Sequence, residues 1–331
     1  MPSFLIWILV PLALLGFGWL SRVLAENRER LTSVPPGELV DIGGRRLHMM
    51  KRGSGGPTVV IESGGASSSA MWWPLQDALA DTCCVVSYDR AGLGWSDAAP
   101  LPRTMEQRVD DLEALLHCAG ITPPCVLVGL SYGGPLIRLY AKRHPDRVAG
   151  LVFIDISHEA VFTTPGAQTY LHRTSTALKV IATAATFGIP RLLRLRGLIK
   201  EATALPYTAP QLQALTSRYP TAHSFRAGAD EFASVLRLGE AMQELGKPGL
   251  LGSTPVSVIS HGQPFPGPFA VLETNHMEGQ RALAALSDNS ELVIAENSSH
   301  AIPLQEPQLV IAAIRRVVHA VQYKSRLQTT G

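Results

Sequence analysis

Charged residues are scarce in this chain of 331 residues. Asp, Glu, Lys and Arg together make up 17% of the sequence, and the formal net charge at pH 7 is only +2. No run of lysine and arginine alternates with aromatic residues, which is the pattern that indicates binding to a nucleic-acid backbone. We therefore expect no nucleic-acid partner.

Cysteines are also few, and their spacing is irregular. All four lie in one central region without a Cys-x-x-Cys pair: Cys83, Cys84, Cys118 and Cys125. A zinc site or a disulfide scaffold would need regular spacing, with histidines at ligand distance for zinc. The pattern predicts buried, reduced thiols and no metal ion.

Apolar residues, in contrast, are abundant, and the first long stretch of them contains no charge. This stretch is Phe4–Leu20. As a helix with a rise of about 1.5 Å per residue it would extend about 26 Å, close to the hydrocarbon thickness of a bilayer. Trp7 and Trp19 lie near its two ends, where aromatic side chains favour the membrane interface. The stretch predicts a single-pass membrane helix.

The charges around this helix indicate its orientation. No Lys or Arg precedes it, whereas Arg22, Arg28 and Arg30 follow it. This asymmetry favours an anchor with the rest of the chain in the cytoplasm, because a signal peptide carries its positive charges before the apolar region. A cleaved signal peptide is the alternative, since the stretch is short and residues 23–25 resemble a cleavage site.

Short β-rich runs follow the membrane helix. Residues 38–53 predict two strands that are joined by a hairpin turn at Gly43-Gly44. The later runs are mostly continuous rather than alternating, which is typical of parallel strands buried on both faces. They are Thr58–Glu62, Cys84–Asp89, Cys125–Gly129, Gly150–Asp155, Pro255–Ser260 and Glu291–Glu296.

Helical stretches alternate with these strands, which predicts a doubly wound α/β fold. The exception is a long region without a strand candidate, from residue 158 to about residue 250, where the pattern predicts a helical cap. We expect an anchor and linker over residues 1–30 and one α/β domain over residues 31–331, into which the cap is inserted.

One serine has the sequence context of a nucleophile. Gly129-Leu130-Ser131-Tyr132-Gly133 matches the pattern G-x-S-x-G between a predicted strand and a predicted helix. A serine on so sharp a turn brings neighbouring backbone close, so the flanking positions need residues without side chains. The alternative interpretation is an ordinary glycine-rich turn.

Two further features complete a candidate active site. His300 follows the last predicted strand, at the edge of the sheet where sites of open α/β folds form. The loop after the third predicted strand, Ser63–Ala66, is small enough for its backbone to approach a substrate. We expect the backbone amides of Gly65 and Tyr132 to donate to a developing oxyanion.

From about Gly37 to its end the chain resembles the α/β-hydrolase superfamily. The motifs that carry the resemblance are Ser87–Asp97 (SYDRAGLGWSD), Val128–Gly134 (VGLSYGG) and Ser298–Pro307 (SSHAIPLQEP). The resemblance implies a mostly parallel eight-stranded sheet, a Ser-acid-His triad, an oxyanion hole and a cap after the sixth strand. The chain carries Ser63-Gly64 where many members have His-Gly. Asp89 and Arg90 are expected to hold their loop rather than to react.

The acid of the triad has more than one candidate. In the superfamily it usually follows the seventh strand, but here no carboxylate follows that strand until Glu273. Asp155 ends the sixth strand, an arrangement that resembles haloalkane-dehalogenase-like relatives and keeps the order Ser, Asp, His. We expect Asp155 to be the acid, with Glu273 and Asp288 as alternatives.

These residues predict a serine hydrolase that cleaves a carboxylic ester through an acyl-enzyme and needs no cofactor. The apolar cap and the membrane helix favour a lipophilic small-molecule substrate.

Two alternatives stay open. An amidase or aminopeptidase-like enzyme, or a carbon–carbon bond hydrolase, would use the same triad, and Asp230 and Glu231 are the only hint of a site for a substrate amine. A membrane-tethered binding protein is the second alternative: it would have the same fold but would not turn over a substrate.

Overall fold

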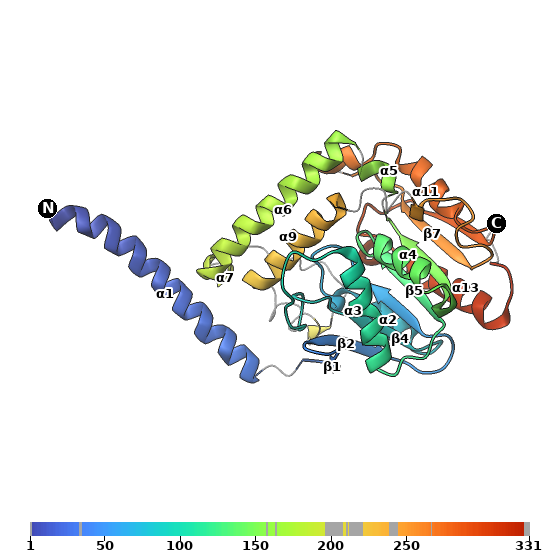
Figure 1. Cartoon of the computed structure of the whole chain (residues 1–331), viewed down its shortest axis with the longest axis horizontal. Coiled ribbons are helices and arrows are strands. Elements are labelled where there is room, and N and C mark those ends of the chain that lie inside the picture. The colour runs from blue at the N-terminus through green and yellow to red at the C-terminus, as the bar shows by residue number, and fades with distance from the viewer. Residues whose placement is uncertain are drawn as a thin grey trace.

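The computed structural model places an eight-stranded sheet at the centre of the molecule (Figure 1). It describes residues 2–32, 35–156, 158–162, 164–195, 208–209, 211, 221–237, 244–265 and 267–327. The strand order is β1-β2-β4-β3-β5-β6-β7-β8. The strands are β1 (Glu38–Asp41), β2 (Arg46–Arg52), β3 (Val59–Glu62), β4 (Val85–Tyr88), β5 (Cys125–Leu130), β6 (Val148–Ile154), β7 (Val256–His261) and β8 (Ser290–Ala295).

The predicted hairpin and the predicted parallel sheet are both confirmed. β1 and β2 pair antiparallel through a turn in which Gly43 and Gly44 have φ angles of +91° and +90°, a conformation that costs a glycine little. β2 is antiparallel to β4, and all pairs from β4 to β8 are parallel. The carboxyl ends of these six strands therefore meet at one edge of the sheet.

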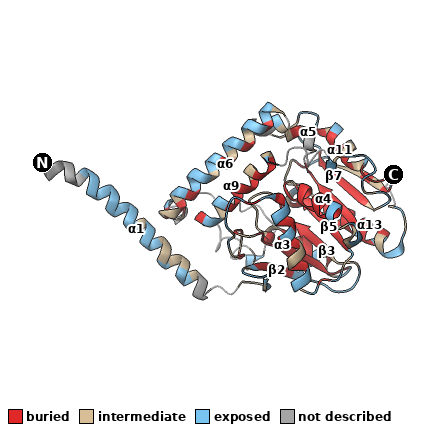
Figure 2. Ribbon diagram, viewed as in Figure 1, coloured by how far each residue is buried: buried red, intermediate tan, exposed pale blue. Residues whose placement is uncertain are grey.

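Helices cover both faces of the sheet, so that the central strands are buried (Figure 2). One face packs against α3 (Met105–Cys118), α4 (Gly133–Arg143) and α11 (His276–Ala284), and the other against α2 (Trp73–Leu79) and α13 (Pro307–Tyr323). The shorter helical segments are η1 (Ser69–Trp72), η2 (Pro145–Arg147), η3 (Gly267–Leu272) and α12 (Ile302–Gln305). Burial on both faces explains why the strands read as continuous apolar runs.

The described part of the inserted region contains helices and turns and no strand. It contains α5 (Glu159–Phe162), α6 (Pro165–Thr186), α7 (Ile189–Leu195) and α9 (Ala222–Leu236), and α6 and α9 lie side by side over the sheet edge (Figure 1). Residues 196–207, 212–220 and 238–243 of the expected cap fall outside the described residues. The exact limits of anchor, domain and cap stay predictions.

A long helix, α1 (Pro2–Thr32), extends away from the rest of the molecule (Figure 1). Its segment Trp7–Glu29 is long and apolar enough to cross a membrane, and a signal sequence would meet the same criteria. The second half of α1 contacts the cap, because Arg22 Nε donates to the carbonyl oxygen of Thr186 at 2.9 Å. Close to this contact, a side chain at Gly188 would meet the carbonyl oxygen of Gly18 at 2.8 Å.

The prediction of four buried thiols is wrong at one position. Cys83, Cys84 and Cys125 are buried, but Cys118 is exposed, and all four are free. Cys118 is the last residue of α3, where the helix turns its end to solvent next to the exposed Gly120. The prediction followed the general tendency of free cysteines to be buried, which does not hold at this exposed helix end.

Candidate active site

Ser131 lies on a strained turn between β5 and α4. Its φ angle is +50°, in the left-handed region that a residue with a side chain rarely adopts. A Cβ atom on Gly129 would lie 2.9 Å from the carbonyl group of Gly133, and one on Gly133 would collide with the carbonyl oxygen of Glu62. The two glycines therefore allow the backbone to fold this tightly, as the G-x-S-x-G pattern predicts.

Asp155 lies at the end of the neighbouring strand in an equally unusual conformation. Leu130 pairs with Ile154, so that Ser131 and Asp155 follow adjacent strand ends, and the φ angle of Asp155 is +47°. The side chain of Asp155 is fully buried, and its Oδ2 lies 2.6 Å from Nδ1 of His300. This contact leaves Nε2 of His300 for another partner.

The structure thus brings Asp155 and His300 together across 145 residues of sequence. The Oγ of Ser131 makes no hydrogen bond to His300 in the described part of the chain. Catalytic hydrogen bonds are often long before a substrate binds, so this geometry is compatible with a nucleophile and its base. The side chain of His300 is 41% exposed, which leaves it accessible to a substrate.

The alternative acids do not contact His300. Glu273 Oε1 lies 3.1 Å from Nε2 of a different histidine, His261, at the end of β7. Asp288 is exposed, on a turn that precedes β8. Of the three carboxylates considered, only Asp155 is within hydrogen-bond distance of His300.

The two residues whose amides are the expected oxyanion donors, Gly65 and Tyr132, lie next to each other. A Cβ atom on Gly65 would lie 3.4 Å from Cβ of Tyr132, and 3.3 Å from the ring of Phe232 in the cap. Tyr132 is the residue before the first turn of α4, where unpaired amides and the helix dipole favour negative charge. Its hydroxyl is 3.0 Å from Ser234 Oγ, which ties this turn to helix α9.

Arg90 has a structural role, as expected, but the loop that it holds is Ser63–Ala66 rather than its own loop. Its guanidinium donates to the carbonyl oxygens of Ser63 and Gly64, both at 2.7 Å, and is buried. Two buried carboxylates balance its charge: Glu62 at the end of β3 and Glu231 in α9. Glu231 Oε2 also accepts the backbone N–H of Ala66 at 2.7 Å.

The acidic pair in the cap is not available to a substrate amine. Glu231 is bound to Arg90, and Asp230 accepts hydrogen bonds from the side chains of Arg108 and Arg237, at 2.8 and 3.1 Å. Asp230 also accepts the backbone N–H of Arg103 at 2.9 Å. Because both carboxylates are neutralised by arginines, the one feature that hinted at an aminopeptidase is structural.

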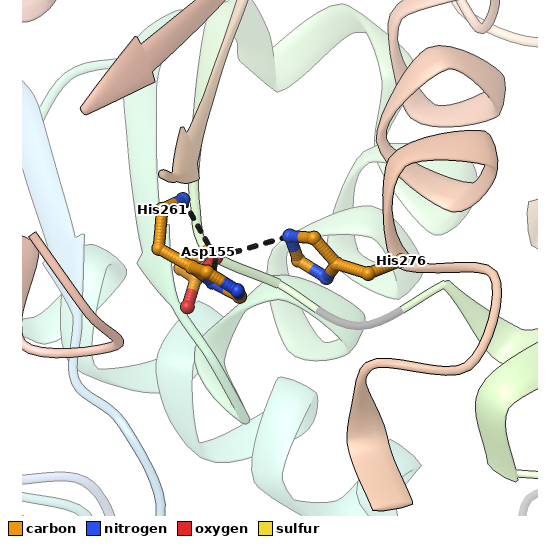
Figure 3. Close-up of side chains that lie close together, drawn as sticks. All are labelled: Asp155, His261 and His276. Carbon is orange, nitrogen blue, oxygen red and sulfur yellow. Dashed lines mark hydrogen bonds and ion pairs between the residues drawn. The ribbon is translucent and has the colours of Figure 1, made fainter. Parts of the chain in front are cut away.

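Two further histidines lie beside Asp155, and neither is among the site residues predicted from the sequence. His261 Nδ1 lies 2.7 Å from Asp155 Oδ1, and His276 Nε2 lies 3.7 Å from the same oxygen (Figure 3). By distance alone the three residues could meet at a metal ion, since their ligand atoms all lie within 4.8 Å of one another. Hydrogen bonds already engage these atoms, including a 2.8 Å contact between His276 Nε2 and Ser260 Oγ, and we assign no metal here.

Asp155, His261 and His276 shift one another's pKa values. Burial disfavours a charged Asp155, but hydrogen bonds from His261 and His300 outweigh it and hold the pKa of Asp155 well below its usual range. Burial also opposes protonation of His261, yet the hydrogen bond and charge of Asp155 and the charge of Glu273 raise the pKa of His261. Burial and the neighbouring His261 lower the pKa of His276.

Comparison with known proteins places this architecture in a family. Residues 57–307 match the family model described as the alpha/beta hydrolase fold. A curated relative, the uncharacterized protein YqjL of Bacillus subtilis, is 28% identical over 277 residues, which cover 82% of this chain and 88% of that protein. The family match thus includes strands β3 to β8, the inserted cap region and the candidate site residues.

Solved structures agree with the fold. A thermophilic esterase from Thermogutta terrifontis is similar with a TM-score of 0.61 at 21% identity, over 87% of this chain and all of that chain. The haloalkane dehalogenase DatA from Agrobacterium tumefaciens is similar with a TM-score of 0.62 at 19% identity, over 86% and 96% of the two chains. At such identities the likeness establishes the fold and does not choose between the two chemistries.

Proposed function

This chain belongs to the alpha/beta hydrolase family, and on that basis we propose that it is a serine hydrolase that cleaves a carboxylic ester. The observation that carries the proposal is the pair of strained strand ends at Ser131 and Asp155, with His300 bound to Asp155 at 2.6 Å. A serine at the turn, rather than an aspartate, favours acyl transfer over the aspartyl-ester chemistry of dehalogenases.

In the proposed mechanism, Nε2 of His300 accepts the proton of Ser131 while Oγ attacks the ester carbonyl carbon. The amides of Gly65 and Tyr132 donate to the oxyanion that forms, and the Asp155 carboxylate stabilises the imidazolium. His300 then protonates the departing alcohol, which leaves an acyl-enzyme. A water molecule, deprotonated by His300, attacks the acyl carbon, and the acid departs as Ser131 regains its proton. No cofactor takes part.

The proposal extends to substrate and location. The substrate is a lipophilic ester of a small molecule, because the apolar cap and the helix α1 would bring the site close to a membrane. We propose that the apolar stretch Phe4–Leu20 is a single-pass anchor rather than a cleaved signal sequence, and that the catalytic domain lies on the cytoplasmic side.

The test is the rate at which a fluorophosphonate probe labels the detergent-solubilised protein. We expect rapid labelling of the wild type, none of Ser131→Ala, and labelling of Asp155→Asn slowed by roughly 10⁴-fold, because the imidazole loses the group that fixes its tautomer. Asp288→Asn is the matched control, since it makes the same change at an exposed carboxylate, and its rate should equal that of the wild type. If folded wild-type protein does not react with the probe, the proposed hydrolase function is wrong, and a membrane-tethered binding protein without turnover becomes the better proposal.

A further inference from the structure

Both oxygens of the Asp155 carboxylate are bound by histidines. Oδ2 accepts from His300 Nδ1 at 2.6 Å. Oδ1 faces His261 twice, since it lies 2.7 Å from Nδ1 and 3.2 Å from the backbone nitrogen. A proposed triad needs only the first of these contacts, so the second requires its own explanation.

His261 lies between two carboxylates. Its Nδ1 faces Asp155 and its Nε2 faces Glu273 Oε1 at 3.1 Å, while only 3% of its side chain is exposed. A neutral imidazole donates from one ring nitrogen only. Two ionised carboxylates, one at each nitrogen, therefore require the imidazolium form, in which both nitrogens carry a proton. Glu273 is itself held in place by the backbone N–H of Phe265, at 2.5 Å.

The other titratable groups around His261 leave this arrangement intact. His276, from α11, stacks on the His261 ring with centroids 4.1 Å apart, and a cation at His261 favours a neutral His276. His300, from the loop after β8, reaches the cluster through Asp155. Phe265 packs edge-on against the His261 ring at 4.7 Å and shields it from water. Among the described residues, Asp155 and Glu273 are the anions that contact His261.

We propose that His261 is a positioning residue for the Asp155 carboxylate: held as a cation by Glu273, it fixes the carboxylate toward His300 and offsets part of its negative charge. The inference rests on the proposed function and deepens it. Without the His261 cation, Asp155 would present its full negative charge to His300 and favour the imidazolium over the neutral base, so that activity would need a higher pH. His261 and Glu273 thereby set the acidic limit of activity.

Two variants separate the charge of His261 from its hydrogen bond. His261→Asn places an uncharged N–H donor near the position of Nδ1, and Glu273→Gln keeps an acceptor for Phe265 while it removes the anion that favours the imidazolium. We expect the acidic limb of the labelling rate, measured with the fluorophosphonate from about pH 4 to about pH 9, to move up by roughly half to one pH unit in both. His261→Ala also removes the donor, and its plateau rate should fall about tenfold or more.

Glu278→Gln is the matched control, because it makes the same change on α11 at an exposed position, and its limb should match the wild type. Wild-type protein that labels through Ser131, together with two variants whose limbs are unchanged within error, would overturn the role of His261 and leave the proposed function standing. Wild-type protein that does not label would overturn the proposed function itself. If His261→Asn fails to fold, Glu273→Gln decides, since its side chain is partly exposed.

Discussion

At the scale of single residues, the site depends on backbone conformations that the chain tolerates only where its neighbours are small. Ser131 and Asp155 both have positive φ angles at adjacent strand ends. Such strain costs on the order of 1–3 kcal/mol per residue and persists only where the surroundings enforce it. Here they do so by close packing, because Gly133 touches the backbone of β3 at Glu62.

This packing predicts the effect of a single methyl group. Gly133→Ala should lower the free energy of unfolding by about 1–3 kcal/mol, since the added Cβ has no space beside the Glu62 carbonyl. It should also slow labelling at Ser131, because the turn must widen. Gly166→Ala is the control, as its Cβ would meet only Val271 at 3.4 Å. Equal denaturant midpoints for the two variants would show that the turn accommodates the added methyl group without loss of stability.

Some residues of the candidate site could be predicted from the sequence, and one could not. Ser131 and His300 follow from motif and position, and Asp155 from the order of the strands. His261 could not be found in this way, because its importance comes from a contact with Asp155 that crosses 106 residues of sequence. One signal was present: His261 occupies the end of the seventh strand, where the superfamily usually has its acid.

At the scale of helices and strands, one cap helix supports the proposed oxyanion loop, Ser63–Ala66, through charged side chains. Glu231 in α9 accepts from Arg90 Nε at 2.7 Å and from the amide of Ala66, while Arg90 holds the carbonyls of the same loop. These contacts cross 141 and 165 residues of sequence. The strands were predictable from their apolar runs, but the pairing of a buried arginine with a distant glutamate depends on tertiary packing alone.

Removing the charge of Glu231 should therefore affect stability and reactivity together. Breaking a buried ion pair by removing one partner typically costs about 3–5 kcal/mol, and we expect Glu231→Gln to lose up to this amount of unfolding free energy. Labelling should also slow, because the amide of Gly65 is no longer fixed. Glu244→Gln, in an exposed pair with Lys247, should change stability by less than about 0.5 kcal/mol. If Glu231→Gln is destabilised but is labelled at the wild-type rate, the reactivity of Ser131 does not depend on the contact between this loop and the cap.

At the scale of the whole molecule, helix α1 and the cap meet where the apolar stretch ends. The contact with Thr186 comes from Arg22, two residues after the last residue of that stretch, Leu20. If α1 spans a bilayer, this contact places the corner between α6 and α7 at the membrane surface. The exposed apolar side chains of α7, Ile189 and Leu192, would then face lipid rather than water.

The exposed thiol offers a direct test of this orientation. Cys118 lies on the α/β domain, and the other three cysteines are buried, so that a membrane-impermeant maleimide should modify the folded protein at Cys118 alone. In sealed vesicles with the cytoplasmic face inward, we expect no labelling until detergent is added, and immediate labelling in vesicles of the opposite orientation. Cys118→Ser should stay unlabelled in both. Labelling of the first vesicles without detergent would place the domain outside, and recovery of a soluble chain that begins after Ala25 would identify α1 as a signal sequence.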